Sequence, residues 1–250
     1  MKKREPVDRR LICPFTVNAG QEKYLADTQE RNILLFNSFV KKNKFHEFLL
    51  ITDEKSYEYL GKPDNVEVEL YDTDKFKFID DFKVTLLPQL DKEEVIIDFD
   101  LYLYRPLTIN SNYDLIVDRY EEEWAYRIYL EKINAIPFND IKNYFLNIEN
   151  TGIPNIGIFK IVNKKLLTDY YVKYFNLRDT FITLSEAINF NYKPYSALFS
   201  QFILMDVINN NKSSVFPCGN VNHYKHLNGD LKYKLSNNKL MKIINDKALV

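Results

Sequence analysis

The stretch Val95-Ile96-Ile97-Asp98-Phe99-Asp100 decides the fold of this chain, and it continues through Leu101-Tyr102-Leu103-Tyr104-Arg105-Pro106. Its three β-branched residues are typical of a strand that is buried on both faces. Burying an ionised carboxylate without a partner costs several kcal/mol. We therefore expect Asp98 and Asp100 at the carboxyl end of this strand, in a crevice, facing a cation. Residues two apart on a strand project to the same side, about 6–7 Å apart along it.

Upstream of this strand, apolar runs typical of strands alternate with segments typical of helices. Strands are predicted at 11–15, 46–52 and 66–70, and helices at about 27–42, 53–60 and 83–90. This alternation predicts an α/β fold with a mixed, mostly parallel sheet and helices on both faces. Ligands of such sheets bind outside the carboxyl ends of the strands. The loop after the first strand, with Thr16 and Asn18, is therefore expected there together with the acidic pair.

The second half of the chain is less regular. Strands are predicted at 114–118 and within 151–161, and helices at 124–133, 164–175 and 195–209. Because the sequence shows neither internal repeats nor a clear linker, we predict one domain over residues 1–250. Its core is expected to span about residues 11–209, with a C-terminal extension over about 210–250.

The composition excludes several classes of protein. The chain has 250 residues, 46% hydrophobic and 28% charged, which is ordinary for a globular protein. A net charge of −1 gives no electrostatic reason to bind nucleic acid. No apolar run is long enough to suggest a membrane span, and no apolar segment of a secretory signal follows Lys2, Lys3 and Arg4. We expect a cytoplasmic protein in which Cys13 and Cys218 are small buried hydrophobes.

A second motif lies near the C-terminus, His226-Leu227-Asn228-Gly229-Asp230-Leu231-Lys232. Imidazole is a good ligand for a cation such as Mn²⁺ alongside carboxylates. Gly229 would let the backbone approach a phosphate closely, and Lys232 would supply a positive charge for a diphosphate. We therefore predict that His226 binds one metal ion together with the acidic pair. His223 is an alternative ligand, and His46 is interpreted as structural.

Together the two motifs resemble those of GT-A-fold glycosyltransferases of family 8, the glycogenin and lipopolysaccharide galactosyltransferase kind. The resemblance covers most of the chain, from Leu11 to Lys232. It implies that Tyr24 stacks on uracil, that Asn155 and Gly157 line the donor-sugar pocket, and that Gln201 lies near the reacting sugar carbon. The chain departs from the family at Gln21 and Ser200, where an acid is usual, and at Tyr233, where Pro-Trp is common.

The implied activity is transfer of a hexose from a UDP-sugar to a glycan, lipid or protein acceptor, with retention of configuration. Mn²⁺ or Mg²⁺ is the implied cofactor. Asp100 and His226 would bind the metal, Asp98 would contact the metal or the ribose, and Lys232 would bind phosphate. Gln201 completes the implied catalytic set. In such a reaction the protein mostly orients the reactants and stabilises charge on the diphosphate.

Other readings of the same residues stay open. An inverting enzyme would need a base, for which Asp118 and the run Glu121-Glu122-Glu123 are candidates, although such a run is typical of a solvated face. Arg119 and Trp124 are candidates to contact an acceptor sugar, or Trp124 lies at the edge of the core. A sugar-nucleotidyltransferase is an alternative, although 17–23 lacks its glycine-rich loop. A catalytically inactive protein of the same fold that binds a glycan or partner is another.

Overall fold

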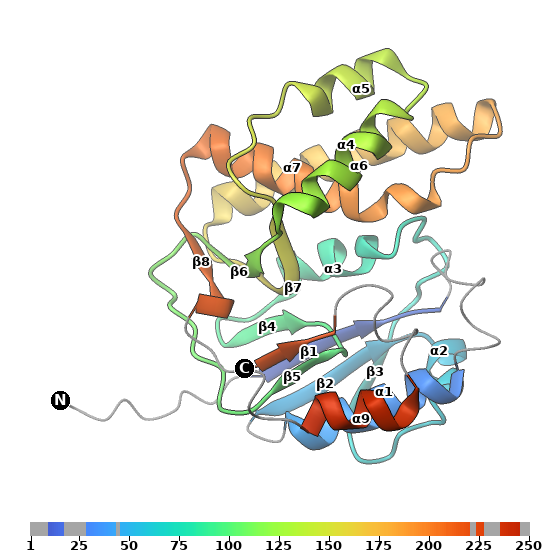
Figure 1. The fold of residues 1–250 in the computed structure, drawn as a ribbon, viewed down its shortest axis with the longest axis vertical. Helices are drawn as coiled ribbons and strands as arrows, with labels where there is room; N and C mark the ends of the chain where they lie inside the picture. The colour runs from blue at the N-terminus through green and yellow to red at the C-terminus, as the bar shows by residue number, and fades with distance from the viewer. Residues whose placement is uncertain (1–9, 18–28, 44–45, 221–223, 228–235, 246–250) are drawn as a thin grey trace. The chain divides into compact units, whose positions relative to one another are not determined.

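The computed structural model describes residues 10–17, 29–43, 46–220, 224–227 and 236–245, drawn as a ribbon in Figure 1. The chain divides into two compact units. The first unit comprises residues 1–76, 90–108 and 219–250, and the second comprises 77–89 and 109–218. The single domain expected from the sequence stays a prediction.

The first unit is built on four parallel strands in the order β3-β2-β1-β4. Its elements are β1 (Arg10–Phe15), α1 (Gln29–Lys42), β2 (Glu47–Thr52), α2 (Glu54–Tyr59), β3 (Glu67–Leu70), β4 (Glu94–Ile97), β5 (Leu101–Leu103), β9 (Tyr224–His226) and α9 (Asn237–Asn245). The strand order reverses between β1 and β4, because the chain passes outward through β2 and β3 and then returns to the other side of β1. Such a switch point is where open α/β sheets bind their ligands.

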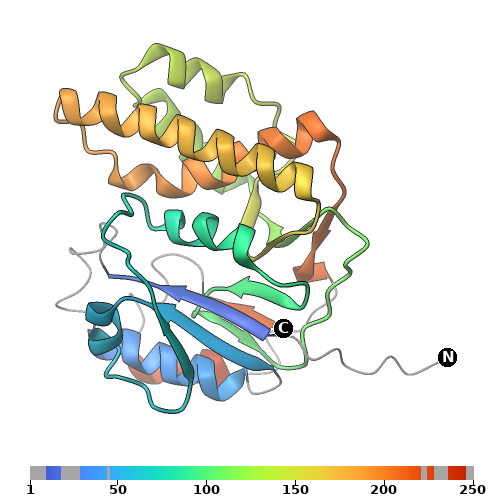
Figure 2. The ribbon, with the colours of Figure 1, turned by 180° about the vertical axis from the view of Figure 1, so that it is seen from behind.

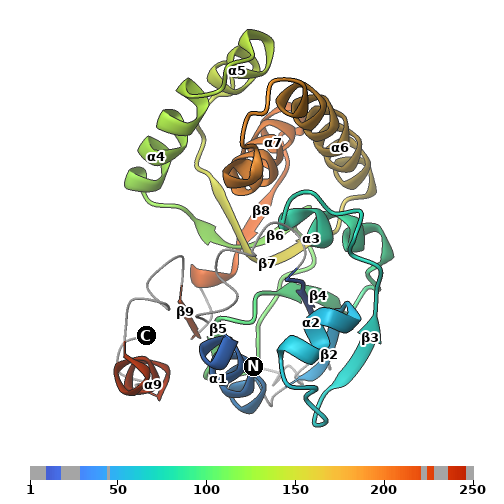
Figure 3. The same cartoon turned by 90° about the vertical axis from the view of Figure 1, so that its right-hand side faces the viewer.

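Apolar packing against one face of these strands holds the first unit together. Phe36 of α1 and Leu60, which follows α2, form a cluster with Phe15 and Leu50 of the strands. Figure 3 shows α1 and α2 beside β2 and β3. Fully burying a side chain of this size stabilises the fold by about 1.5–3 kcal/mol. The apolar face predicted for the helix at 27–42 is therefore the face that α1 buries against the strands.

The second unit combines three strands with a group of helices. Its strands lie in the order β7-β6-β8, with β6 antiparallel to β7 and parallel to β8. Its elements are α3 (Asp80–Leu86), β6 (Leu115–Tyr120), α4 (Glu123–Asn134), α5 (Asn139–Leu146), β7 (Pro154–Ile161), α6 (Lys164–Ala187), α7 (Ser196–Asn211) and β8 (Val215–Pro217). The longest of them, α6, packs along α7 (Figure 2). The predicted α/β fold with a mixed, mostly parallel sheet is confirmed.

Several boundaries differ from the sequence prediction. The helix predicted at 164–175 continues to Ala187, because Phe181, Ile182 and Ser185 extend its buried face. The helices α5 and α9 and the three-residue strands β5, β8 and β9 were not predicted. Elements of three residues are too short to show a periodic pattern. Among the described residues, no helix has the length and apolar character needed to cross a membrane.

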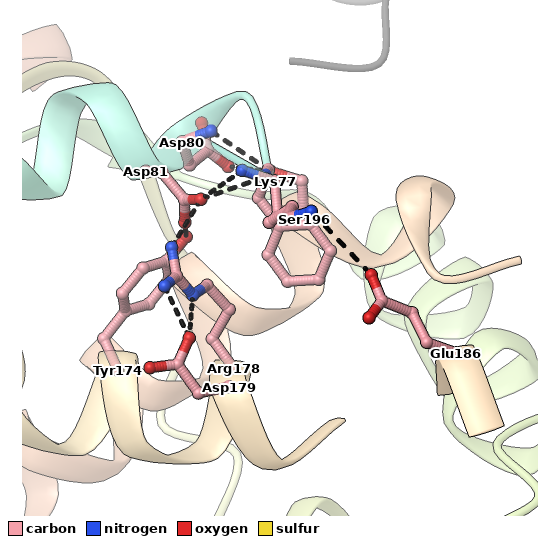
Figure 4. Close-up of polar contacts among 9 residues, drawn as sticks. Lys77, Asp80, Asp81, Tyr174, Arg178, Asp179, Glu186 and Ser196 are labelled. Carbon is pink, nitrogen blue, oxygen red and sulfur yellow. Dashed lines mark hydrogen bonds and ion pairs between the residues drawn. The ribbon is translucent and has the colours of Figure 1, made fainter. Parts of the chain in front are cut away.

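A buried carboxylate, Asp81, ties α3 to α6 (Figure 4). Its Oδ2 accepts a hydrogen bond from Nη1 of Arg178 at 2.6 Å, and its Oδ1 accepts one from the Tyr174 hydroxyl at 2.7 Å. Backbone N–H groups of Lys77 and Phe78 also donate to Oδ2. Burial raises the pKa of the Asp81 carboxyl, and the guanidinium acts in the opposite direction. Breaking such a buried pair by removing one partner costs about 3–5 kcal/mol.

Candidate metal centre

The acidic pair lies in a turn that directly follows β4. Val95, Ile96 and Ile97 are fully buried, as expected for a strand covered on both faces. The strand ends at Ile97, and the N–H of Leu101 donates to the carbonyl of Asp98 at 3.1 Å. The expected place at the carboxyl end of the strand is therefore found. The expectation that Asp98 and Asp100 stand two apart on the strand is wrong, because the backbone turns between them.

A short antiparallel ladder brings His226 to this turn. Leu101 of β5 stands opposite His226 of β9, and Leu103 stands opposite Tyr224. The ladder extends by one hydrogen bond, from the Leu227 N–H to the carbonyl of Asp100 at 3.0 Å. Because register sets which side chains face each other, this pairing places the imidazole beside the acidic turn.

The three side chains predicted to share a metal ion converge. Nε2 of His226 lies 3.3 Å from Oδ1 of Asp100 and 4.0 Å from Oδ2 of Asp98. One ligand atom from each residue lies within 4.8 Å of the other two. The side chains of His226 and Asp100 are each 5% exposed, and that of Asp98 is 27% exposed. The more open Asp98 is thus the member best placed to meet a ligand from solvent.

Two distances within the donor set, both measured from the His226 imidazole, suit a hard divalent cation. Atoms that bind one Mg²⁺ at 2.0–2.1 Å lie at most about 4.2 Å apart, and Mg²⁺ takes few carboxylates and keeps its remaining positions for phosphate and water. The two distances from the His226 imidazole, 3.3 and 4.0 Å, fall within that limit. An imidazole ligand shifts the preference toward Mn²⁺. The role of these residues as ligands stays a prediction.

Thr16, expected near the ligand, belongs to a hydrogen-bond cluster around Asp53. Oδ2 of Asp53 accepts from the hydroxyls of Thr16 at 2.9 Å, Thr73 at 2.8 Å and Ser56 at 2.6 Å. Its Oδ1 caps α2 by accepting from the Ser56 N–H at 2.8 Å. Burial acts to raise the pKa of Asp53, but these hydrogen bonds hold it below its ordinary value. The cluster joins the segments that follow β1, β2 and β3, a role that the sequence did not reveal.

Asn155 and Gly157 lie in an irregular part of β7. The register of β6 and β7 shifts after Val117, and Arg119 pairs with Asn155. Oδ1 of Asn155 accepts from the Gly157 N–H at 2.9 Å, and its amide donates to Oε1 of Glu121 at 2.7 Å. Bulges of this kind are common beside active sites, where they re-aim a side chain. The donor-sugar role of both residues stays a prediction.

Gln201 and its neighbour Ser200 are buried in α7. Oε1 of Gln201 accepts from the Tyr129 hydroxyl at 2.8 Å. The Ser200 hydroxyl donates to Oδ2 of Asp80 at 2.8 Å, and the Ser196 hydroxyl donates to the same oxygen at 3.2 Å. Where the resembled family has an acid beside the glutamine, this chain therefore has a serine that binds an acid from α3.

The candidates for a base on the inverting reading all have partners. The amide of Asn155 binds Glu121, the indole of Trp124 binds Glu122 at 2.8 Å, and Arg127 binds Glu123 at 2.7 Å. Asp118 is fully buried and pairs with Arg119 at 3.3 Å. Each of these carboxylates therefore has a polar partner, although Glu122 and Glu123 lie at the surface. His46 also has the structural contact expected of it, since its Nε2 accepts from the Leu107 N–H at 2.8 Å.

Several predicted residues lie outside the part of the chain that the structure describes. They are Asn18, Gln21, Tyr24, His223, Gly229, Lys232 and Tyr233. Base stacking by Tyr24 and diphosphate binding by Gly229 and Lys232 therefore stay predictions.

No protein-family model matches the chain, and no curated protein matches it. A solved structure with some likeness is that of CTP:phosphocholine cytidylyltransferase from Streptococcus pneumoniae, at 11% sequence identity and a TM-score of 0.43. The match covers 96% of this chain and 100% of that chain. So distant a likeness does not bear on the chemistry of the site. The resemblance to family 8 rests on the motifs alone.

Proposed function

We propose that the chain is a metal-dependent glycosyltransferase that moves a hexose from a nucleotide-diphosphate sugar, a UDP-sugar, to an acceptor with retention of configuration. The observation that carries this proposal is the convergence of Asp98, Asp100 and His226 on one point after β4. Two carboxylates with one imidazole suit Mn²⁺ or Mg²⁺. Their place beside the switch point of a parallel sheet suits a nucleotide ligand.

In this proposal Asp100 and His226 hold the cation, and the more exposed Asp98 contacts the cation or the ribose. The bound cation would offset charge on the departing diphosphate. Gly229 and Lys232 are assigned to the diphosphate, Tyr24 to the base, and Asn155, Gly157 and Gln201 to the sugar. The chain's own contribution is to orient the donor and to stabilise charge that develops on its phosphates.

Retention is favoured because the carboxylates considered as bases are already engaged. Glu121, Glu122 and Glu123 each bind a neighbouring side chain, and Asp118 is fully buried. In a retaining transfer the departing phosphate can itself accept the acceptor's proton on the same face of the sugar. The reaction then needs no protein base.

Thermal unfolding with Mn²⁺ and a panel of nucleoside diphosphates tests the proposal. A ligand at 100 times its dissociation constant adds about 2.7 kcal/mol of stability, which is about 5–10 °C in Tm for a chain of this size. We expect UDP to stabilise the protein only when Mn²⁺ is present. Asp100→Asn should abolish that shift, and the matched surface variant Asp64→Asn should keep it.

Activity separates the possible enzymes. Slow Mn²⁺-dependent hydrolysis of a UDP-sugar, lost in Asp100→Asn, supports the glycosyltransferase. Release of pyrophosphate from a nucleoside triphosphate and a sugar phosphate would instead identify a sugar-nucleotidyltransferase. If no nucleotide stabilises the protein with or without Mn²⁺, both enzyme readings are wrong, and the non-catalytic binding protein is favoured.

A further inference from the structure

In the second unit, β6 ends shortly before α4 begins (Figure 1). Two aromatic side chains are exposed at this junction. Tyr120, the last residue of β6, is 40% exposed, and Trp124, in the first turn of α4, is 59% exposed. Ile128, one helical turn further along α4, is 44% exposed. Because Tyr120 and Trp124 are four positions apart in the chain, their Cα atoms are at most about 14 Å apart. We call Tyr120 and Trp124 the aromatic surface.

The ring of Tyr120 is supported from one side by the backbone at Gly152. A Cβ atom at Gly152 would lie 2.9 Å from Cδ1 of Tyr120, and Gly152 has φ +106°, which side chains rarely adopt. A side chain at position 152 is therefore disfavoured for two reasons: its Cβ atom would clash with the Tyr120 ring, and the backbone has a positive φ. Glycine there lets the tyrosine ring lie directly on the backbone, which restricts the ring's orientation.

The ring of Trp124 is held by its polar edge. Its Nε1–H donates to Oε2 of Glu122 at 2.8 Å. Glu121, which lies between Tyr120 and Glu122 in the chain, accepts a hydrogen bond from the side-chain amide of Asn155 at 2.7 Å. The Tyr120 ring is thus confined by the backbone at Gly152, and the Trp124 indole has a polar partner, while much of each ring stays exposed. A ring that is already confined loses less conformational entropy when a ligand stacks on it.

We propose that the aromatic surface binds the saccharide part of the acceptor, and that Tyr120 and Trp124 determine acceptor specificity. This rests on the proposed function. The C–H faces of a pyranose ring pack on aromatic rings, while its hydroxyls donate to carboxylates such as Glu122. Asn155 is assigned to the donor sugar, and its amide donates a hydrogen bond to Glu121, the residue that follows Tyr120. The aromatic surface is therefore linked through Glu121 to a residue assigned to the donor.

Local charge and area argue against other occupants. The run Glu121 to Glu123 disfavours an anionic ligand such as a nucleic acid. A stable protein interface buries about 800 Å² per partner. The two rings of the aromatic surface and the neighbouring Ile128 can each bury at most about 250 Å², so by themselves they do not reach that area. A neutral oligosaccharide needs only two stacked rings and a few hydrogen bonds.

The chain contains a single tryptophan beside 18 tyrosines, so emission excited at wavelengths that only tryptophan absorbs reports on Trp124 alone. The full chain, free of nucleotide and metal, is first screened on an array of neutral oligosaccharides and then titrated with those that bind. We expect a saturable change in emission. Tyr120→Ala should weaken binding about tenfold, since an aromatic contact contributes up to about 1.5 kcal/mol. Ile188→Ala, at an exposed apolar residue of the same unit, should leave the affinity unchanged.

Calorimetry tests Trp124 itself, since its replacement removes the fluorescence signal. Trp124→Ala should abolish binding and Trp124→Phe should retain part of it. Glu122→Gln, which keeps an acceptor for the indole, should bind more tightly than Glu122→Ala. The Tm of each variant is measured as well, and only variants whose Tm equals that of the unmodified chain are compared. A folding defect is then not mistaken for lost binding.

The result separates this inference from the proposed function. Failure of every array saccharide to bind, or unchanged affinity in Tyr120→Ala, overturns the inference even if UDP with Mn²⁺ stabilises the protein. The inference is also overturned if the Trp124 emission changes only with protein concentration and sedimentation shows dimers. The aromatic surface would then be a contact between two copies of the chain. Saccharide binding without any nucleotide response would uphold the surface as a glycan site and contradict the transferase.

Discussion

His226 lies with its Nε2 3.3 Å from Oδ1 of Asp100, because the two residues are joined through the β5–β9 ladder. His226 pairs with Leu101, the residue that follows Asp100, and Leu227 donates its N–H to the carbonyl of Asp100. The position of the His226 imidazole therefore depends on backbone pairing between β5 and β9, and not on a side-chain contact alone. Anything that separates β9 from β5 should remove one ligand while leaving all three residues in the chain.

Replacing Lys225 by proline tests that dependence. Lys225 pairs with Tyr102 in the middle of the ladder, and proline cannot donate a ladder hydrogen bond. We expect Lys225→Pro to weaken Mn²⁺ binding at least tenfold, because the loss of one held ligand typically costs that much. Isothermal titration calorimetry with Mn²⁺ measures the effect.

Lys225→Thr is the matched control, since it removes the same charge but keeps the N–H and favours a strand. It should bind Mn²⁺ like the unmodified chain. If Lys225→Pro also binds Mn²⁺ normally while its circular dichroism is unchanged, then His226 is not held as a metal ligand by this ladder.

Asp53 should make stability depend on pH. Its folded-state pKa is lowered, so its contribution is present above the unfolded pKa of about 3.9 and is lost as the pH falls through the lower folded value. Asp53→Ala should destabilise the protein by roughly 2–4 kcal/mol at pH 7, because it removes a helix cap and leaves three hydroxyls without their acceptor.

Urea unfolding at pH 7, 5 and 3 measures this effect. The difference between the unmodified chain and Asp53→Ala should be similar at pH 7 and 5 and smaller at pH 3. Asp64→Asn serves as the control and should show no such trend. A difference that grows toward low pH would contradict the assigned direction of the pKa shift.

Ser200→Asp should be poorly tolerated although the resembled family has an acid there. The Ser200 hydroxyl lies 2.8 Å from Oδ2 of Asp80, and Ser200 is fully buried. Two carboxylates at that distance cannot both ionise, so we expect a loss of roughly 3 kcal/mol or more at pH 8 and less at pH 4. Ser200→Ala should cost only about 1 kcal/mol.

The double variant Asp80→Ser with Ser200→Asp checks the cause. It exchanges the two groups and should recover most of the stability that Ser200→Asp loses. If the double variant is as unstable as the two single changes added together, the repulsion between positions 80 and 200 is not the reason.

Much of the first unit could be predicted because its signals are local. The fully buried run at Val95 to Ile97 and the alternation of strands and helices before it follow from periodicity. The bound partners of Glu121 and Asp53 could not be predicted, since Asn155 and Thr16 are remote in sequence and no pattern links them. The turn between Asp98 and Asp100 was missed because no proline or glycine marks it.

The sequence alone determined the α/β class and the acidic end of β4, because residue periodicity and the cost of burying charge act within a few neighbours. It also singled out His226 as a partner for that acidic end. Only the tertiary structure decided how the three residues meet. The deciding contact is a ladder of three residue pairs, β5 with β9, whose register depends on long-range strand pairing that short segments do not encode.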